Sequence, residues 1–435
     1  MHARLYSDER RTSHASPAQR VLSFSARFAY LDPVRKEKII IIFTVLVDVI
    51  GFGIVIPILP FYVGEFGASA TTITLMFASF SCFSFLSSPF LGALSDRIGR
   101  RPLLITSIAS TAVGWFVFAG ATTIPMLFLG RIIDGAAAGN FSIAQSYLVD
   151  ISENDKERTT NLGIIGAAFG IGFMLGPLIG GLLSTVSHAF PFWFAGGLAT
   201  VNACVAYFYL PETLKHRNTD DRLRFNPLRP LMNAVRDTAL RPLYISWIMF
   251  ALAFVTSQSV FALFVGKNFG FDSFTTGLTF TAMGLIVAIN QVGLLKHLWL
   301  RRFTEPVLEV MMLSSLLIGF LLFTAKTMTT FVISALFIST GQSVLRVILT
   351  SQVAGAAEPK TKGEKMGILS SLMAASMVVG PVIAGPLYEI HDTLPYFAAG
   401  GYILTALVFA LTYQRRARTA AEVVRVNTVD EAPLM

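Results

Sequence analysis

The sequence predicts an all-α membrane protein with twelve transmembrane helices in two six-helix halves. Of its 435 residues, 54% are apolar and only 14% are charged, and the mean hydropathy is +0.64. A soluble domain carries about 25% charged residues, so this chain lacks the polar side chains that a water-facing surface needs. Apolar segments long enough to cross a bilayer core of about 30 Å recur along the chain. The composition therefore excludes a soluble globular protein and a disordered one.

Twelve segments meet this requirement of length and hydropathy. Each must form a helix, because lipid offers the backbone no hydrogen-bond partner and a helix satisfies its own amides. The segments of the first half are Ile39–Phe61, Thr72–Gly92, Leu103–Gly120, Thr123–Tyr147, Leu162–Leu183 and Phe192–Leu210. Those of the second half are Leu243–Val265, Phe274–Leu295, Val307–Ala325, Thr329–Thr350, Met366–Tyr388 and Tyr396–Tyr413.

A polar stretch between the two halves sets the expected domain boundaries. We expect an N-terminal tail at 1–38, a six-helix half at 39–210, a linker at 211–241, a second half at 242–413 and a C-terminal tail at 414–435. Equal halves suggest two repeats, and transporters built from repeats bind their substrate at the interface between them.

The linker has a helical hydrophobic pattern. Its apolar residues at helical spacing are Leu228, Leu231, Met232, Val235 and Ala239. Arg229 and Arg236 fall elsewhere on the same helix. This pattern favours a short amphipathic helix on the cytoplasmic membrane surface, and a solvated linker is the alternative.

Lysine and arginine are concentrated in the loops on one side of the predicted membrane. Only Lys267 and Lys326 fall on the other side. Because basic residues accumulate in cytoplasmic loops, we expect a multi-pass protein of the cell membrane (the inner membrane of a bacterium) with both termini and the linker in the cytoplasm. The formal net charge of +8 then reflects topology, so the expected partner is the lipid bilayer and not nucleic acid.

The N-terminal tail contains arginine and serine residues, as a transit peptide does. It also contains the acidic residues Asp8, Glu9, Asp32 and Glu37, and it leads directly into a full-length span. These features weigh against a cleaved targeting peptide. No separate short apolar region indicates a secretory signal.

The loop after the second span combines one carboxylate, three guanidinium groups and two glycines. These residues are Gly92, Asp96, Arg97, Gly99, Arg100 and Arg101. Glycine permits sharp bends and close helix approach. Ion pairs in such a turn can form in one conformation and break in another, so we interpret the loop as a gate. A cluster that only fixes membrane orientation is the alternative.

This loop resembles the G-x-L-[SA]-D-[RK]-x-G-[RK]-[RK] motif of the major facilitator superfamily at every position. The resemblance implies a fold of two six-helix halves that alternate between inward-open and outward-open states. It also implies that Asp96 faces the start of the eleventh span near Gly363–Gly367, where a helix N-terminus favours negative charge. By the same resemblance, Asp150 at the end of the fourth span pairs with Arg100.

The charged residues inside the first and fourth spans are the candidates for proton coupling: Asp48 in the first, and Arg131 and Asp134 in the fourth. A charge inside hydrocarbon costs several kcal/mol unless it is paired or hydrated. Arg131 and Asp134 are three residues apart and can pair on one helix face, and Asp48 comes to a similar depth. Two carboxylates near one guanidinium make protonation and pairing compete, so we expect proton coupling here. A static ion pair holding the two spans together is the alternative.

The fifth span contains a glycine stripe that lets another helix pack closely. Its run of Gly172, Gly176, Pro177, Gly180 and Gly181 resembles the antiporter motif of drug:proton exporters. The resemblance to this superfamily, and to its tetracycline and multidrug exporters, extends from Ile39 to Tyr413. It departs in the third span, where tetracycline exporters carry an acidic residue and this chain has Gly114 near that position.

Four polar residues inside spans are the expected substrate contacts: Asn140, Gln145, Gln258 and Gln342. They lie in the fourth, seventh and tenth spans, which line the cavity in the superfamily. Amides also hold helices together, and that is the alternative for each. An aromatic cavity wall among the 37 phenylalanines would suit a flat, lipophilic compound.

The sequence offers no metal, cofactor or enzymatic site. Cys82 and Cys204 lie in apolar segments, the six histidines are scattered, and no nucleotide-binding or nucleophile motif occurs. We therefore expect a monomeric antiporter, driven by the proton gradient, that exports a small organic compound. A metabolite or siderophore transporter of the same fold, including a symporter, is one alternative. A membrane sensor or scaffold without transport is another.

Overall fold

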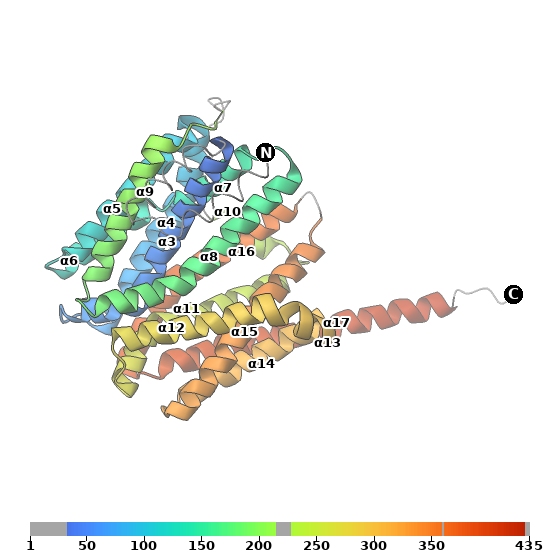
Figure 1. Cartoon of the computed structure of the whole chain (residues 1–435). Coiled ribbons are helices and arrows are strands. Elements are labelled where there is room, and N and C mark those ends of the chain that lie inside the picture. Colours follow the sequence, from blue (N-terminus) through green and yellow to red (C-terminus); the bar gives the residue numbers. More distant parts are fainter. Residues whose placement is uncertain (1–32, 215–227, 359–360, 431–435) are drawn as a thin grey trace, which may run out of the picture.

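The structure is a bundle of long helices. A computed structural model describes residues 33–214, 228–358 and 361–430 (Figure 1). Most of the predicted N-terminal tail (1–32) and part of the predicted linker (215–227) lie outside the described residues, as do 359–360 and 431–435. The expectation that the tail is not a cleaved targeting peptide therefore stays a prediction.

The helices fall into two groups joined by a short helix. The first group is α3 (Pro33–Gly64), α4 (Ala70–Ile98), α5 (Arg100–Ala119), α6 (Ile124–Ala136), α7 (Asn140–Asp150), α8 (Asp155–Ser184) and α9 (Phe190–Tyr209). Helix α10 (Arg229–Arg236) lies in the linker. The second group is α11 (Arg241–Phe269), α12 (Ser273–Ala288), the π-helical segment η2 (Ile289–Trp299), α13 (Leu300–Arg302), α14 (Glu305–Phe323), α15 (Met328–Ala356), α16 (Lys362–Ile390) and α17 (Leu394–Asp430).

The fourth predicted span is interrupted. Among the described residues, eleven helices are long and apolar enough to cross a membrane, because Thr123–Tyr147 forms two shorter helices, α6 and α7. The hydroxyl of Ser87 donates to the Gly135 carbonyl oxygen (2.8 Å), and that of Ser107 donates to the Ala137 carbonyl oxygen. The expectation of one continuous helix was therefore wrong. The break is tolerated because hydroxyl groups of α4 and α5 bind the carbonyl oxygens that the interrupted helix leaves free.

Two other helices differ from the predicted spans. The eighth span passes through the π-helical segment η2 before it ends at Arg302. The last helix, α17, continues to Asp430, so residues 414–430 of the expected tail extend the helix of the twelfth span.

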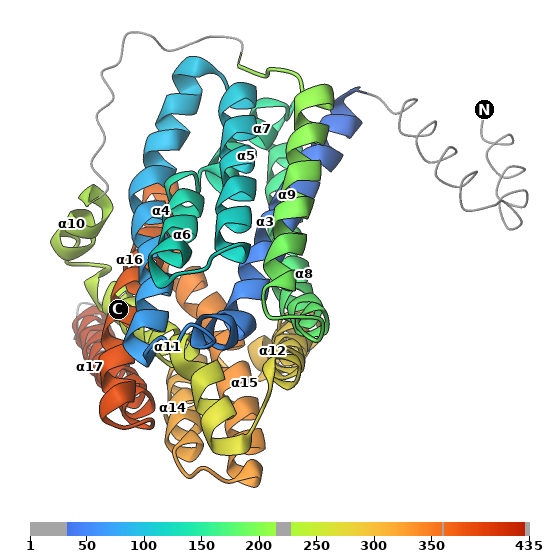
Figure 2. The ribbon, with the colours of Figure 1, turned by 90° about the vertical axis from the view of Figure 1, so that its left-hand side faces the viewer.

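The two groups approach each other at one end and diverge toward the other. In Figure 1, α8 and α12 meet on the left and separate toward the right. Figure 2, seen from the left-hand side of Figure 1, shows the second group below the first. The diverging end carries the arginine-rich loop between α4 and α5, and we name it the basic end. The other is named the opposite end.

Direct contacts join the groups at the opposite end. The backbone N–H of Thr71, in the first turn of α4, donates to Oε1 of Glu389 in the last turn of α16 (2.8 Å). The buried hydroxyl of Ser273 donates to that of Ser184 (2.9 Å). Toward the basic end, a Cβ atom built on Gly363 or on Gly367 would meet nothing within 4 Å. The structure is therefore closed at the opposite end and open at the basic end.

The glycine stripe of α8 packs against α3. A Cβ atom at position 176 would lie 2.7 Å from the Cα atom of Gly53 and 2.8 Å from the carbonyl oxygen of Ile50. At position 172 it would lie 2.9 Å from Cβ of Val49. Backbone atoms of α3 fill the space at position 176 and the Val49 side chain fills it at position 172, so both positions favour glycine. The stripe thus fixes α8 on α3.

The same stretch of α8 also contacts the second group. A Cβ atom on Gly277 of α12 would lie 2.5 Å from the Pro177 carbonyl oxygen and 3.0 Å from Cα of Gly181. The residues of the predicted antiporter motif therefore face two helices, α3 within their own group and α12 across the interface.

Replacing Gly176 by alanine should destabilise the protein. The added methyl group meets backbone on α3, and overpacking of this kind costs about 1–3 kcal/mol. Gly170→Ala is the matched control on the same helix, because nothing lies within 4 Å of a Cβ atom there and alanine favours a helix over glycine. Thermal unfolding of the purified variants in detergent measures the difference. Equal unfolding temperatures for Gly176→Ala and wild type would contradict this packing.

Candidate functional site

The charged residues predicted in the fourth span form a buried ion pair. Nη1 of Arg131 lies 3.1 Å from Oδ2 of Asp134, and the two residues are 1% and 6% exposed. Both lie on α6, three residues apart, as the helical spacing requires. The pairing lowers the penalty of placing either charge in the membrane.

Aromatic rings cover the guanidinium of Arg131. Its Cζ atom lies 4.3 Å from the ring centroid of Phe80 on α4 and 5.4 Å from that of Trp115 on α5. A desolvated cation over an aromatic face gains about 2 kcal/mol. These two residues could not be predicted from the sequence, because apolar side chains inside spans give no signal that distinguishes a cation partner from ordinary core.

Asp48 lies at the edge of this cluster, and no ion pair joins it to a cation in the described part of the chain. Its carboxyl group is close to the Asn140 side chain and within electrostatic range of Asp134. The Asn140 amide donates to the hydroxyl of Thr111 (3.4 Å), which is also close to Asp134. Within the described chain, the buried Oδ1 atom of Asp48 has no hydrogen-bond partner. The structure therefore connects both carboxyl groups through polar side chains.

Gly114 explains why the third span has no acidic residue. A Cβ atom at this position would lie 2.9 Å from the backbone nitrogen of Asp134 and 3.0 Å from the Gly130 carbonyl oxygen. Any side chain on α5 would collide with α6 here. Asp134 occupies the space that an acidic residue at position 114 would need.

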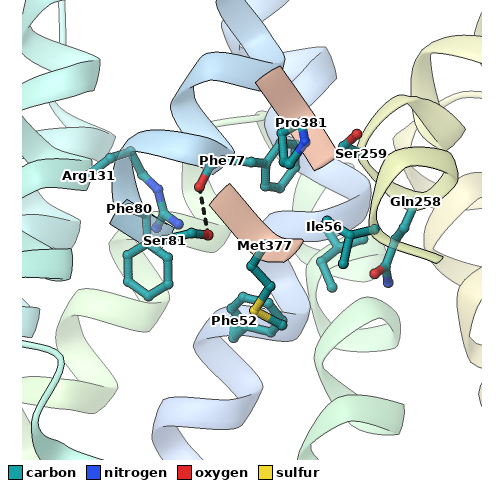
Figure 3. A pocket seen from close by; sticks show the side chains of 11 residues that line it. Phe52, Ile56, Phe77, Phe80, Ser81, Arg131, Gln258, Ser259, Met377 and Pro381 are labelled. Carbon is teal, nitrogen blue, oxygen red and sulfur yellow. Dashed lines mark hydrogen bonds between the residues drawn. The ribbon is translucent and has the colours of Figure 1, made fainter. Parts of the chain in front are cut away.

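A small cavity lies between the two groups beside Arg131 (Figure 3). The empty space around it, which includes part of the open gap between the groups, is about 450 Å³. The lining comes from α3, α4, α6, α11 and α16: Phe52, Ile56, Phe77, Phe80, Ser81, Arg131, Val255, Gln258, Ser259, Met377 and Pro381. Most of these side chains are apolar, and the polar groups are few, as in sites for lipophilic ligands.

The structure brings one of the four expected substrate contacts to this cavity. Gln258 lines it. Asn140 is buried against Thr111, which matches the alternative of an amide between helices. Gln145 and Gln342 are half-buried and are not among the lining residues. An aromatic cavity wall was expected, but the residues that form it could not be identified from the sequence, because they resemble ordinary core residues.

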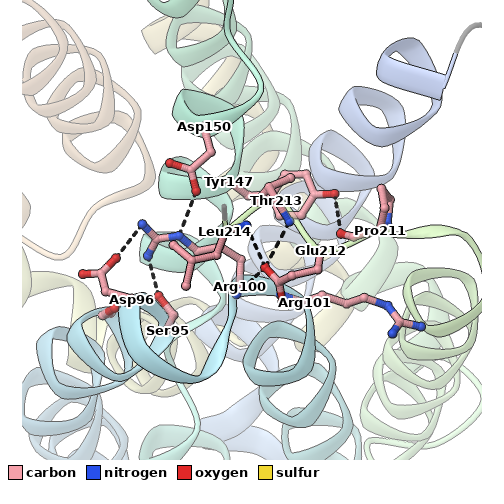
Figure 4. Close-up of polar contacts among 11 residues, drawn as sticks. Ser95, Asp96, Arg100, Arg101, Tyr147, Asp150, Pro211, Glu212, Thr213 and Leu214 are labelled. Carbon is pink, nitrogen blue, oxygen red and sulfur yellow. Dashed lines mark hydrogen bonds and ion pairs between the residues drawn. The ribbon is translucent and has the colours of Figure 1, made fainter. Parts of the chain in front are cut away.

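Arg100 is the centre of the polar network at the basic end (Figure 4). Its guanidinium lies 2.6 Å from Oδ1 of Asp96, 3.0 Å from Oδ2 of Asp150 and 2.5 Å from the hydroxyl of Ser95. The pair of Arg100 and Asp150 that the resemblance implied is present. One guanidinium thus joins the end of α4, the start of α5 and the end of α7.

The other expected contact of this loop is absent from the structure. Asp96, at the end of α4, is exposed and pairs with Arg100 at the start of α5. Gly363 and Gly367, at the start of α16, have open space around them. The expectation that Asp96 faces the start of α16 is wrong for this conformation. The reason is geometric, because the two groups diverge at the basic end.

Glu212, after α9, completes the network and was missed as a site residue. Its carboxylate accepts the backbone N–H groups of Arg100 (2.9 Å) and Arg101 (3.2 Å) at the start of α5. A negative charge at a helix N-terminus is favourable. Tyr147 donates to the carbonyl oxygen of Pro211 (2.8 Å) and ties the same segment to α7.

The two glycines of the loop have different surroundings. Gly99 has φ of 125°, a conformation open to glycine alone, and a Cβ atom there would collide with the Glu212 carboxylate. At Gly92 the nearest atom is the hydroxyl of Ser142, 3.7 Å away, so no close approach requires glycine. Arg97 is half-buried, and Arg101 donates to the Tyr207 carbonyl oxygen (2.7 Å).

At the opposite end, Lys267 and Lys326 converge on Asp392. Their Nζ atoms lie 3.2 Å and 2.7 Å from its carboxylate oxygens. Burial opposes the charge on Asp392, but the hydrogen bonds from the lysines and Asn268 outweigh it and hold the pKa of this carboxyl below its usual value. This cluster holds the loop before α17 to α11. No group of three metal-ligating side chains occurs among the described residues.

Comparison with known proteins identifies relatives along most of the chain. The family model described as Major Facilitator Superfamily matches residues 41–308. The class C tetracycline resistance protein of Escherichia coli is 28% identical over 80% of this chain and 89% of its own length. Multidrug resistance protein 2 of Bacillus subtilis (strain 168) is 25% identical over 88% of this chain and 96% of its own.

A solved structure has the same fold. The crystal structure of the human organic anion transporter MFSD10 (TETRAN) superimposes with a TM-score of 0.64 at 24% sequence identity, covering 87% of this chain and all of that one (100%).

Variants of Gly99 and Glu212 should be energetically coupled. Gly99→Ala should destabilise the protein by about 1–3 kcal/mol through backbone strain, beyond its collision with the carboxylate. Glu212→Ala should cost about 0.5–2 kcal/mol, as loss of a helix cap does. The double variant should lose less than the sum, because the colliding carboxylate is gone. Thermal unfolding of all four proteins gives this cycle, and strict additivity would contradict the contact.

Glu389→Gln should weaken closure at the opposite end. The carboxylate accepts the Thr71 N–H at a helix N-terminus, and loss of the charge should shift the equilibrium by about 1 kcal/mol, or about fivefold. Spin labels at Val186→Cys and Ile390→Cys, with Cys82 and Cys204 replaced by serine, report the distance between groups.

The matched control is Glu65→Gln, because Glu65 contacts His188 within the first group. A distance distribution that Glu389→Gln leaves unchanged, or that both variants shift alike, would contradict the role of Glu389.

Proposed function

This chain belongs to the Major Facilitator Superfamily, and we propose that it exports a small, lipophilic organic compound in exchange for protons. It is a multi-pass membrane transporter. The names of its relatives, a tetracycline resistance protein and a multidrug resistance protein, support efflux of such compounds. We take the proton gradient as the only energy source, with no bound cofactor, and the monomer as the functional unit.

One observation carries the proposal: two carboxyl groups share the surroundings of one buried guanidinium beside an apolar cavity. Asp134 is neutralised by Arg131, whereas Asp48 has polar neighbours and no ion pair within the described chain. An unpaired carboxylate inside the membrane costs several kcal/mol, and a bound proton removes that cost. Proton exchange at this cluster therefore changes the charge next to the cavity, which is the minimum that coupling requires.

The basic end faces the cytoplasm in this proposal. Its loops carry the lysines and arginines that accumulate on the cytoplasmic side, which places both termini there and the protein in the cell membrane. The structure then corresponds to an inward-open state that admits substrate from the cytoplasm. Asp96, Arg100 and Asp150 would re-form contacts with α16 when the basic end closes and the opposite end opens.

The driving force is sufficient for efflux. One proton crossing a potential of 100 mV releases about 2.3 kcal/mol, which sustains a nearly fifty-fold concentration gradient of an uncharged substrate. The aromatic lining, with Phe52, Phe77 and Phe80, would bind a flat molecule by stacking and apolar contact.

Asp48→Asn should abolish uphill transport. We expect an imposed pH gradient to drive tetracycline or ethidium into inverted vesicles containing wild type, and the variant to lose at least tenfold of this flux because it has lost a proton carrier. Asp155→Asn is the control, because its carboxylate is fully exposed at the basic end.

The direction of flux tests the alternatives. Accumulation in right-side-out vesicles instead would favour a symporter of metabolites or siderophores. Proton-driven flux that survives the double variant Asp48→Asn and Asp134→Asn would refute the proposed coupling. Absence of flux for a broad panel of compounds would favour a sensor or scaffold.

A further inference from the structure

Helix α10 has an exposed apolar side. Leu228, Met232 and Val235 are 54%, 46% and 70% exposed. Their spacing of four and three residues places them on one face of the helix. Such a face has no favourable contact with water, and it lies in the linker at the basic end.

The other side of α10 is docked on the second group. Leu231 and Ala234 pack against the core. Asn233 donates to Glu364 (2.9 Å), and Lys365 donates to Asp237 (2.5 Å). Both partners lie in the first turn of α16, and α10 lies beside α16 in Figure 2. The helix is therefore held to α16 with its apolar face turned outward.

Two arginines lie along one side of the apolar face. At 100° per residue, Arg229 and Arg236 fall on the side of the helix between the exposed apolar residues and Asn233. Both are exposed, and neither forms an ion pair within the described part of the chain. Arg241 and Lys362, at the starts of α11 and α16, are exposed at the same end. The surface around α10 thus combines apolar side chains with four exposed basic residues, beside the Glu364 carboxylate that Asn233 contacts.

We propose that α10 binds the surface of an anionic lipid leaflet. Its apolar residues enter the boundary between headgroups and acyl chains, and Arg229 and Arg236 bind lipid phosphates. An apolar stripe with basic residues along its edge is typical of helices that lie in this interface, and the protein already spans the bilayer beside it. A protein partner would need a broader surface than three apolar side chains provide.

Lipid binding at α10 acts on the helix that closes the opposite end. α16 begins with the residues that hold α10 and ends with Glu389, which accepts the Thr71 N–H. Anionic lipid would therefore hold the start of α16 at the membrane surface. Lipid binding at α10 requires no transported compound.

The test uses the full-length protein in liposomes with a bimane label at Val235→Cys, in a background with Cys82 and Cys204 replaced by serine. Liposomes contain phosphatidylcholine with increasing fractions of phosphatidylglycerol. We expect a blue shift of the bimane emission and quenching by doxyl-labelled lipid as phosphatidylglycerol increases. Each arginine near an anionic surface contributes about a fivefold change in partition. Arg229→Gln with Arg236→Gln should raise the phosphatidylglycerol fraction at half-maximal shift at least fivefold.

Arg301→Gln with Arg302→Gln is the matched control. It removes the same charge from exposed positions at the basic end, on α13, and it should leave the half-maximal fraction unchanged. A label that stays open to quenching by iodide at every lipid composition would overturn the proposal. So would an equal effect of the two double variants. The measurement involves no substrate, so failure of the proposed export would leave its result intact.

Discussion

A charge can lie inside a membrane only if something nearby compensates it, and the centre of the first group is built around that constraint. The guanidinium of Arg131 has a carboxylate on one side and the rings of Phe80 and Trp115 on the others. These contacts hold α4, α5 and α6 together around one cation. Gly114 on α5 and Gly130 on α6 let the two helices meet at backbone contact, beside Asp134. The cavity between the groups borders this same guanidinium.

At both ends of the molecule a carboxylate binds a helix N-terminus, although one end is closed and the other is open. At the opposite end, a carboxylate of the second group binds the N-terminus of α4 and closes the interface. At the basic end, Glu212 binds the N-terminus of α5 within the first group, while Asp96 remains exposed. A helix N-terminus offers free amide groups and a favourable potential for negative charge. Such contacts are strong enough to hold a conformation and weak enough to exchange.

Hydropathy and charge predicted the features that depend on local sequence. The spans, the buried pair of Arg131 and Asp134 and the glycine stripe follow from the requirement that lipid imposes on each segment. The break between α6 and α7 could not be predicted, because it depends on hydroxyl groups from two other helices. The aromatic cover of Arg131 was missed for the same reason. The expected contact of Asp96 with the start of α16 depends on which end of the molecule is closed. The sequence does not indicate which of the two conformations the structure adopts.

Because the fourth span is broken, α5 is the continuous helix that connects the basic end to the Arg131 site. Asp150 lies on α7 and Arg131 lies on α6, and the backbone hydrogen bonds of the helix are interrupted between them. A movement of Asp150 is therefore not transmitted to Arg131 through one continuous helix. Helix α5 is unbroken from Arg100 to Trp115, a length of about 22 Å, and it contacts the carboxylates at one end and the guanidinium at the other. A tilt of α5 would therefore move the Arg100 network and the surroundings of Arg131 together.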